Sequence, residues 1–218
     1  LVKNLFIMTF DEFIQLTPKI AKVSLPATES HLKMSPLERR IQLLNHDYNL
    51  EVARDAAVMM LVYPDKNSAM IALIVRNSYK GVHSSQVAFP GGKVEKNESI
   101  LDAALRETQE EIGVDPAEVT IVRAFSSVFI PPSNFNVYPF LGFCNSRPNF
   151  IPDPREVSAM ALFSMADILD DSSLTSVSVN ASYSTDILVP AFTIHNTVIW
   201  GATAMMLQEL KDVLKNFI

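Results

Sequence analysis

The chain has 218 residues and a mass of 24.2 kDa, which is long enough for one sizeable hydrophobic core. Hydrophobic residues make up 48% of it and charged residues 19%, so wholesale disorder is excluded. With 18 basic against 24 acidic residues, the net charge is −6 and the pI is near 5.2, which leaves no broad cationic field to attract nucleic acid.

The N-terminal part of the chain predicts two short helices. One is expected to begin after Thr9, which suits an N-cap, and Pro18 is expected to break or end it. A second is predicted over 35–44, where a serine is the cap and a proline takes the first helical position. We therefore expect residues 1–50 to form a helical extension packed on a domain that spans 51–218.

Two pairs of strands are expected in the middle of the chain. Residues 56–63 and 69–75 are rich in β-branched and aliphatic side chains and flank a polar turn, which predicts a hairpin. Residues 120–130 and 136–144 are predicted to be strands separated by a proline-rich loop. The second of these is apolar enough to be central in a sheet.

The C-terminal part predicts further strands and a closing helix. Residues 157–169 indicate a strand that enters a helix, 173–180 and 186–194 indicate strands, and 204–217 indicate an amphipathic helix. Strands and isolated helices that alternate in this way favour an α/β fold. The sequence has neither a GxGxxG turn after a strand nor a GxxxxGK[ST] loop, which argues against a dinucleotide-binding Rossmann unit and a P-loop enzyme.

Membrane insertion and disulfide bonding are not expected. The longest apolar stretches are far shorter than the roughly 20 residues that a membrane helix needs. The N-terminal segment lacks the cleavage site of a secretory signal. The one cysteine, Cys144, lies in an apolar run and is predicted to be a buried thiol rather than a nucleophile. Together these features favour a cytoplasmic protein.

The segment 92–114 carries the strongest functional signal. Asn97 or Ser99 can cap a helix that runs to Ile112, and Gly113 is placed to end it. At about 100° per residue, an apolar stripe and an acidic stripe separate on this helix. The apolar stripe contains Leu101, Ala104, Leu105, Thr108 and Ile112. The acidic stripe contains Glu107, Glu110 and Glu111, with Ala103 one turn earlier leaving room for a substrate.

The three glutamates need a compensating charge. Glu107 and Glu111 form a like-charge i,i+4 pair, which destabilises a helix by about a few tenths of a kcal/mol. Arg106 can offset only one charge, so bound divalent cations explain the cluster better than a solvated acidic face does. Mg²⁺ or Mn²⁺ suits carboxylate oxygens, whereas zinc would normally show His or Cys ligands. Bound cations would also recruit an anionic substrate to this acidic protein.

The same segment resembles the Nudix box, the motif of a family of hydrolases that act on nucleoside diphosphates linked to another group. Thr108, at a position that is usually aliphatic, is a mild departure. The resemblance implies an α/β/α sandwich with a mixed sheet and a loop-helix-loop metal site. The matching residues are Gly92, Glu98, Arg106, Glu107, Glu110, Glu111, Gly113 and Val114.

The resemblance also implies roles for individual residues. Arg106 would hold the glutamates in place, and Glu98 would act in the metal site or through its water. The group that accepts the proton of the attacking water stays open, and Glu156, outside the segment, is one candidate. The implied catalytic residues are Glu98, Arg106, Glu107 and Glu110, and the implied metal ligands are Glu107, Glu110, Glu111 and the carbonyl of Gly92.

Three further segments, 83–93, 131–142 and 199–207, resemble the coenzyme A pyrophosphatase branch of this family. In the last of them, Trp200 is expected to pack against the sheet and Gly201 to allow close approach. The substrate-binding residues taken from this resemblance are Arg76, His83, Phe89, Asn134 and Phe135.

The branch signature is incomplete in this chain. Gly81 and Ser85 stand where an arginine and a glycine are usual, and Ile74 and Arg76 replace threonines. A phosphate contact from the missing arginine is thereby lost, and Arg76 or Lys80 is a candidate to replace it.

The sequence therefore predicts a Mg²⁺- or Mn²⁺-dependent diphosphatase that acts on coenzyme A or a related nucleotide derivative and gives adenosine 3',5'-bisphosphate and 4'-phosphopantetheine. Two alternatives stay open: a diphosphatase for ADP-ribose, NADH or a dinucleoside polyphosphate, and a non-catalytic nucleotide-binding module. The expected partner is a small-molecule nucleotide diphosphate, with a homodimer as an open alternative. No nucleic acid or membrane partner is expected.

Overall fold

A computed structural model describes residues 8–45, 52–77, 86–181 and 184–218. The helices are α1 (Phe10–Ile20), α2 (Thr28–Lys33), α3 (Leu37–Asn45), α4 (Ile100–Ile112), α5 (Met165–Leu169) and α6 (Gly201–Lys215). The large sheet contains β1 (Arg54–Asp65), β2 (Ser68–Arg76), β3 (Val87–Ala88), β4 (Gly91–Lys93), β5 (Thr120–Ala124), β6 (Val128–Ile130), β7 (Phe135–Phe143) and β8 (Val157–Ser164). A small sheet contains β9 (Leu174–Ala181), β10 (Ser184–Ile194) and β11 (Thr197–Trp200).

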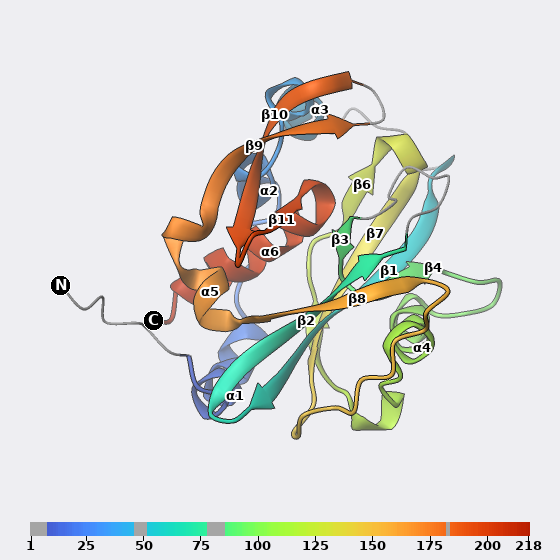
Figure 1. The fold of residues 1–218 in the computed structure, drawn as a ribbon, viewed down its shortest axis with the longest axis vertical. Coiled ribbons are helices and arrows are strands. Elements are labelled where there is room, and N and C mark those ends of the chain that lie inside the picture. The colour runs from blue at the N-terminus through green and yellow to red at the C-terminus, as the bar shows by residue number, and fades with distance from the viewer. Residues whose placement is uncertain (1–7, 46–51, 78–85, 182–183) are drawn as a thin grey trace.

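The helices lie in layers on the two faces of the large sheet. Helix α4 covers one face, and α1, α5 and α6 lie on the other (Figure 1). The sheet is mixed because β1 runs parallel to β7, while β1 and β2 form the predicted antiparallel hairpin. This arrangement confirms the predicted α/β/α sandwich. Among the described helices, none is long and apolar enough to cross a membrane.

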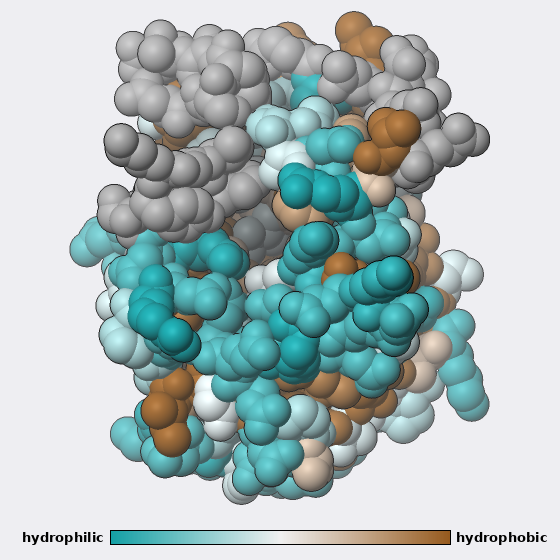
Figure 2. All heavy atoms as spheres, turned by 90° about the vertical axis from the view of Figure 1, so that its right-hand side faces the viewer, coloured by the Kyte–Doolittle hydropathy of each residue, from teal (hydrophilic) through white to brown (hydrophobic). Residues whose placement is uncertain are grey.

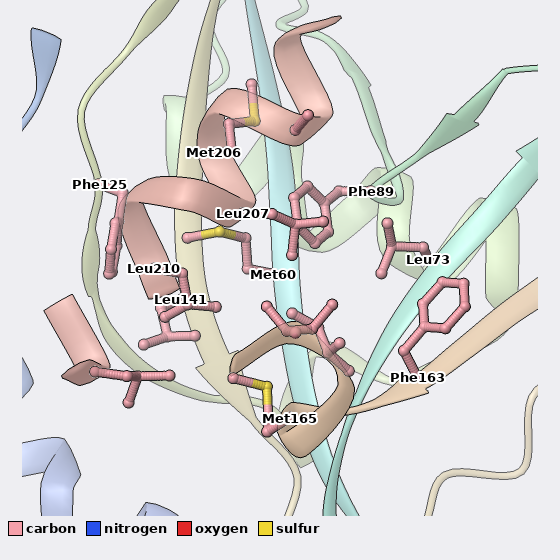
Figure 3. Close-up of a cluster of buried hydrophobic side chains, with 14 of the residues drawn as sticks. Met60, Leu73, Phe89, Phe125, Leu141, Phe163, Met165, Met206, Leu207 and Leu210 are labelled. Carbon is pink, nitrogen blue, oxygen red and sulfur yellow. The ribbon is translucent and has the colours of Figure 1, made fainter. Parts of the chain in front are cut away.

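Alternate side chains of β1 enter two separate cores. Met60 and Val62 pack with residues of α1, α5 and α6, and Met59 and Leu61 pack with residues of α4. Figure 3 shows part of the first core, where Met60 lies among side chains of α6 and neighbouring strands. A strand buried on both faces is apolar throughout, which explains the unbroken hydrophobic run in the sequence.

Strands β1 and β2 diverge, and β3 and β4 fill the gap between them. The β1–β2 pairing extends from the turn only as far as Leu61 and Ala72. Beyond that point β4 pairs with residues 56–58 of β1, and β3 pairs with residues 74–75 of β2. This arrangement brings a glycine pair at the start of β4 to the side of the sheet that α4 covers.

Helix α1 does not break at Pro18, contrary to the prediction. The helix continues to Ile20, and Thr9 caps it as expected. Pro18 has no N–H to donate to the carbonyl of Ile14, four residues earlier. The hydroxyl of Thr17 donates to that carbonyl instead, at 2.9 Å. A neighbouring side chain thus replaces the bond that the proline removes.

The strand predicted over 120–130 is two strands, β5 and β6, both antiparallel to β7. The break lies opposite Pro139 of β7, which has no N–H to contribute to the ladder. Within the break, the Ser126 N–H and hydroxyl donate to the carboxylate of Glu209 on α6. The interruption is therefore satisfied by a helix that is remote in sequence.

Gly201 begins α6 for a different reason from the predicted one. A Cβ on this residue would meet no atom within 4 Å, so close approach is not what requires glycine. Its φ of +66° is the requirement, because L side chains rarely adopt that conformation. The preceding Trp200 is half-buried at the end of β11, which pairs with β10.

Candidate active site

Helix α4 has the ends that the sequence predicts. The Ser99 hydroxyl accepts from the N–H of Asp102, and Gly113 ends the helix in the left-handed conformation with φ 75°. Both signals are local, which is why they can be found without knowing the fold. The helix lies across β1 and β4, so its residues face the glycine pair of β4.

The apolar and acidic stripes of α4 overlap more than predicted. Glu111 is buried on the packing face, whereas Leu105 is only half-buried. At 100° per residue, Glu111 lies about 60° around the helix from Thr108, so both residues are on the face that packs against the sheet. The Thr108 hydroxyl is satisfied by the carbonyl of Ala104 at 2.6 Å, which explains how a polar side chain occupies a usually aliphatic position.

Arg106 joins three glutamates through its guanidinium group. Its Nε and Nη2 donate to the two carboxylate oxygens of Glu98, at 2.7 and 3.0 Å. Its Nη1 donates to Glu107 Oε1 at 2.8 Å and to Glu110 Oε2 at 3.0 Å. Nη2 also donates to the carbonyl of Lys93 at 3.1 Å. The predicted holding role of Arg106 thus matches its contacts, and its hydrogen bond lowers the pKa of Glu98.

Glu107 lies directly against Gly92. A Cβ on Gly92 would come within 2.5 Å of Glu107 Oε1, so only glycine leaves room for this carboxylate. The side chain of Glu107 is largely buried, and this burial raises its pKa above the usual value although Arg106 opposes the effect. The position therefore holds a carboxylate in a place that water reaches poorly.

Glu111 is held by backbone and by a second arginine. Its Oε2 accepts from the N–H of Gly91 at 2.8 Å, and its Oε1 lies 3.3 Å from Arg76 Nη1 and has no hydrogen bond. Burial raises the pKa of Glu111 to about 7, while Arg76 and the Gly91 N–H act in the opposite direction. The sequence analysis does not predict Gly91 as a site residue, although its position directly before Gly92 could have indicated it.

Glu156 lies in the turn that precedes β8. Its backbone carbonyl accepts from the N–H of Asn77 at 2.8 Å, which ties the turn before β8 to the end of β2. Its negative charge contributes to the raised pKa of both Glu107 and Glu111. This candidate proton acceptor therefore interacts electrostatically with two carboxylates of α4.

The other predicted substrate-binding residues do not gather at this cluster. Phe89 is 1% exposed and packs in the core on the opposite face of the sheet, near Leu73 and Leu207 (Figure 3), so its ring is closed off from a ligand in this structure. The Asn134 side chain donates to the carbonyl of Val52, and the Phe135 ring lies under the guanidinium of Arg54. His83 lies outside the described residues.

The residues of α4 and β4 fit a hard divalent cation. Arg106 occupies the space between the glutamates, and among the described residues no three acidic, His or Cys side chains converge as a ready-made metal cluster. The donor set consists of carboxylate oxygens, one of them the buried and unbonded Oε1 of Glu111. Oxygen donors of this kind suit Mg²⁺ or Mn²⁺. The face that carries α4 is mainly hydrophilic where the structure describes it (Figure 2).

Comparison with known proteins bears on this arrangement. A family model described as the NUDIX domain matches residues 53–181. The chain is 27% identical over 199 residues to Nudix hydrolase 3 of Caenorhabditis elegans, which covers 84% of this chain and 82% of that protein. It is 30% identical over 188 residues to an uncharacterized Nudix hydrolase, NudL, of Salmonella newport (strain SL254), which covers 83% of this chain and 94% of that protein.

Other similarities are shorter or lower in sequence identity. Nudix hydrolase 22, chloroplastic, of Arabidopsis thaliana is 36% identical over 113 residues, which span 49% of this chain and only 36% of that protein. A solved structure of a Nudix hydrolase from M. smegmatis, RenU, has a TM-score of 0.53 at 16% identity and covers 76% of this chain and 88% of that chain. A MutT/nudix family protein from Enterococcus faecalis has a TM-score of 0.51 at 19% identity and covers 89% and 76%. The two structures confirm the predicted fold class.

Proposed function

The chain belongs to the Nudix hydrolase family, and from this premise we propose that it hydrolyses the diphosphate linkage of coenzyme A or a closely related nucleotide derivative. Members of the family act on pyrophosphate bonds of nucleoside diphosphate derivatives and generally need a divalent cation, usually Mg²⁺ or Mn²⁺. The observation that carries the proposal is the set of glutamates that Arg106 holds beside Gly92. The proposed products are adenosine 3',5'-bisphosphate and 4'-phosphopantetheine.

The residues of the site have different proposed roles. When bound to these residues, a divalent cation would screen the charge of the diphosphate oxygens and would make an attacking water acidic enough to lose a proton near neutral pH. Arg106 fixes the rotamers of Glu107 and Glu110, two of the glutamates that would hold the cation. Glu98 and Glu156 are the candidates to accept the proton, since both lie near the ligand set without being part of it. The proposed ligands are Glu107, Glu110, Glu111 and the carbonyl of Gly92.

The choice of coenzyme A rests on the segments outside the box. The residues around Phe89, the turn before β7 and the start of α6 resemble the coenzyme A branch. The contacts of Phe89 and Asn134 give these two residues structural rather than ligand-binding roles. These two residues therefore support the coenzyme A branch only as features of its fold and not as substrate contacts. The altered positions at the end of β2 leave ADP-ribose, NADH and dinucleoside polyphosphates as alternative substrates.

A substrate panel tests the proposal. The protein would be incubated with Mn²⁺ and coenzyme A, acyl-coenzyme A, NADH, ADP-ribose or dinucleoside polyphosphates, and the products would be separated by chromatography. We expect the highest kcat/KM with a coenzyme A compound and no turnover in EDTA. A preference for ADP-ribose or a dinucleotide would refute the branch and leave the reaction class intact. Nucleotide binding at full affinity without cations, together with no hydrolysis of any compound, would favour a non-catalytic module.

Glu110→Gln is the matched variant for this test. The Glu110 side chain is 57% exposed and bonds to Arg106 on the surface, so its replacement should leave the melting temperature of the metal-free protein nearly unchanged. Turnover should fall by about 100-fold or more, because a ligand charge is lost. Near-normal turnover, or a much lower melting temperature, would show that Glu110 does not belong to a cation site.

A further inference from the structure

Arg76 is the cationic partner of the most deeply buried glutamate. It is the last residue of β2, and its Nη1 lies 3.3 Å from Glu111 Oε1 and donates to the carbonyl of Gly91 at 3.4 Å. The Arg76 side chain is 22% exposed, whereas that of Glu111 is 1% exposed. The guanidinium therefore stands between a buried carboxylate and the solvent side of the site.

The two arginines of the site serve different glutamates. Arg106 bonds to Glu98, Glu107 and Glu110, while the ion pair of Glu111 is with Arg76. A buried carboxylate without a cation is strongly disfavoured, so Arg76 supplies the compensation that Glu111 needs in the metal-free protein.

A divalent cation on Glu111 would create a conflict with this pair. Arg76 Nη1 is already beside Oε1, the one carboxylate oxygen of Glu111 without a hydrogen bond. Two cations at one buried oxygen repel each other strongly because the surroundings screen them poorly. Binding of one therefore weakens binding of the other.

We propose that Arg76 and the divalent cation exchange on Glu111, and that the displaced guanidinium then binds a phosphate of the diphosphate substrate. This inference rests on the proposed function and extends it. The planar fork of an arginine matches phosphate oxygens in a bidentate manner, and Arg76 is partly exposed beside Glu111. Cation and substrate binding are then coupled, since the first releases the residue that the second uses.

The exchange predicts opposite effects of one substitution on two ligands. Arg76→Gln removes a competitor of the cation, so Mn²⁺ should bind this variant about fivefold or more tightly than it binds wild type. The same change removes a phosphate contact, so ADP in saturating Mg²⁺ should bind about tenfold or more weakly. A residue with a purely structural role would not move the two affinities in opposite directions.

The experiment measures Mn²⁺ binding by electron paramagnetic resonance and ADP binding by calorimetry on the full chain. Arg147→Gln is the matched control, because Arg147 is an exposed arginine paired with Asp65 at the β1–β2 turn. It should leave both affinities at wild-type values. Arg76→Lys keeps the charge but not the fork, so it should leave Mn²⁺ affinity near wild type and still weaken ADP binding. This second variant also tests the proposal if Arg76→Gln does not fold.

Several outcomes would overturn the exchange. Unchanged or weaker Mn²⁺ binding in Arg76→Gln would show that Arg76 does not compete with the cation. Tighter Mn²⁺ binding with unchanged ADP binding would show that the guanidinium does not reach a phosphate. Failure of the proposed function is a separate result, because it appears as no turnover of the substrate panel by wild type, while the Mn²⁺ measurement needs no turnover.

Discussion

Two glycines of this chain are needed for different reasons, and their substitution should separate chemistry from stability. In Gly92→Ala, the added Cβ would collide with the Glu107 carboxylate. We expect this variant to lose about 100-fold or more in kcat, because Glu107 must leave the position in which Arg106 holds it. The measurement is steady-state kinetics with Mn²⁺ alongside a thermal melt.

Gly201→Ala is the control for that variant. Its Cβ meets no neighbour, and its cost comes only from φ +66°. Stability should fall by about 1 kcal/mol while turnover per folded molecule stays unchanged. If Gly92→Ala behaved like Gly201→Ala, the close approach between Gly92 and Glu107 would not matter for catalysis.

Cys144 gives a residue-scale prediction on pH. The thiol is 2% exposed, and burial raises its pKa to about 11 from an ordinary value of 9.0. At pH 8 the thiolate fraction is therefore about 100-fold below that of an ordinary cysteine. Alkylation by iodoacetamide should be at least that much slower in native buffer than in denaturant. Equal rates in the two conditions would contradict the burial.

The sign of the corresponding stability effect follows from the same shift. The folded protein binds the thiol proton more tightly than the unfolded chain does. Cys144 thus contributes stability that is present below about pH 9 and is lost as the pH rises through 11. Cys144→Ser would not reproduce this loss, since a hydroxyl does not ionise in that range.

At the scale of elements, helix α1 shows how a local rule can be overridden. Thr17→Val removes the hydroxyl that satisfies the Ile14 carbonyl, and we expect a loss of about 1 kcal/mol in the free energy of unfolding. In a Pro18→Ala background the new N–H can take that carbonyl, so the same replacement should cost much less. Urea unfolding of wild type, the two single variants and the double variant measures the coupling, and additive effects would refute the compensation.

The elements that could be predicted are those with local signals. The cap at Ser99 and the left-handed end at Gly113 fixed α4 from sequence alone, and the polar turn fixed the β1–β2 hairpin. The prediction that Pro18 breaks α1 was wrong because the Thr17 hydroxyl replaces the lost backbone hydrogen bond, and general rules for proline do not include such a side-chain bond. The break between β5 and β6 could not be predicted because the groups that satisfy it come from α6.

At the scale of the whole molecule, Glu209 of α6 connects three remote segments. Its carboxylate accepts from the N–H of Ala27, the hydroxyl and N–H of Ser126, and lies 3.7 Å from His31 Nε2. Glu209 is fully buried. The N-terminal helices, the β5–β6 connection and the last helix are therefore held by one side chain.

Glu209→Gln should destabilise the protein by about 1–3 kcal/mol, since an amide cannot accept all of these hydrogen bonds. Glu29→Gln, the same change at an exposed site on α2, should stay within about 0.5 kcal/mol of wild type. Urea unfolding measures both. Equal effects of the two variants would contradict a connecting role for Glu209.

The pH dependence of wild type should also change in Glu209→Gln. Burial raises the pKa of Glu209, but the His31 imidazole and Ser126 outweigh this and lower the pKa below its usual value. The carboxylate thus contributes stability that is present above about pH 4.5 and is lost as the pH falls through the lower folded pKa. The variant should lose less stability than wild type over that acid range.

The sequence predicts which glutamates belong to the site, but it does not predict which residues they pair with. The spacing within 92–114 pointed to Glu107, Glu110 and Glu111 because they share one helix, where geometry follows from sequence. That Arg76 meets Glu111 depends on how β2, β4 and α4 pack, and no spacing along the chain encodes it. For the same reason the position of Phe89 could not be predicted. Phe89 is close to the glycine pair in sequence, but it packs on the opposite face of the sheet.

The parallel pairing of β1 with β7 also sets the order in which the molecule can assemble. Arg54 is opposite Phe135, so the chain from β2 through β6 must be looped out before this ladder closes. Such distant pairings form slowly, whereas the hairpins β1–β2 and β9–β10 close locally. During refolding from denaturant, helical and hairpin signals should therefore return before enzymatic activity. A nascent chain would remain inactive until β7 has been synthesised and has found β1.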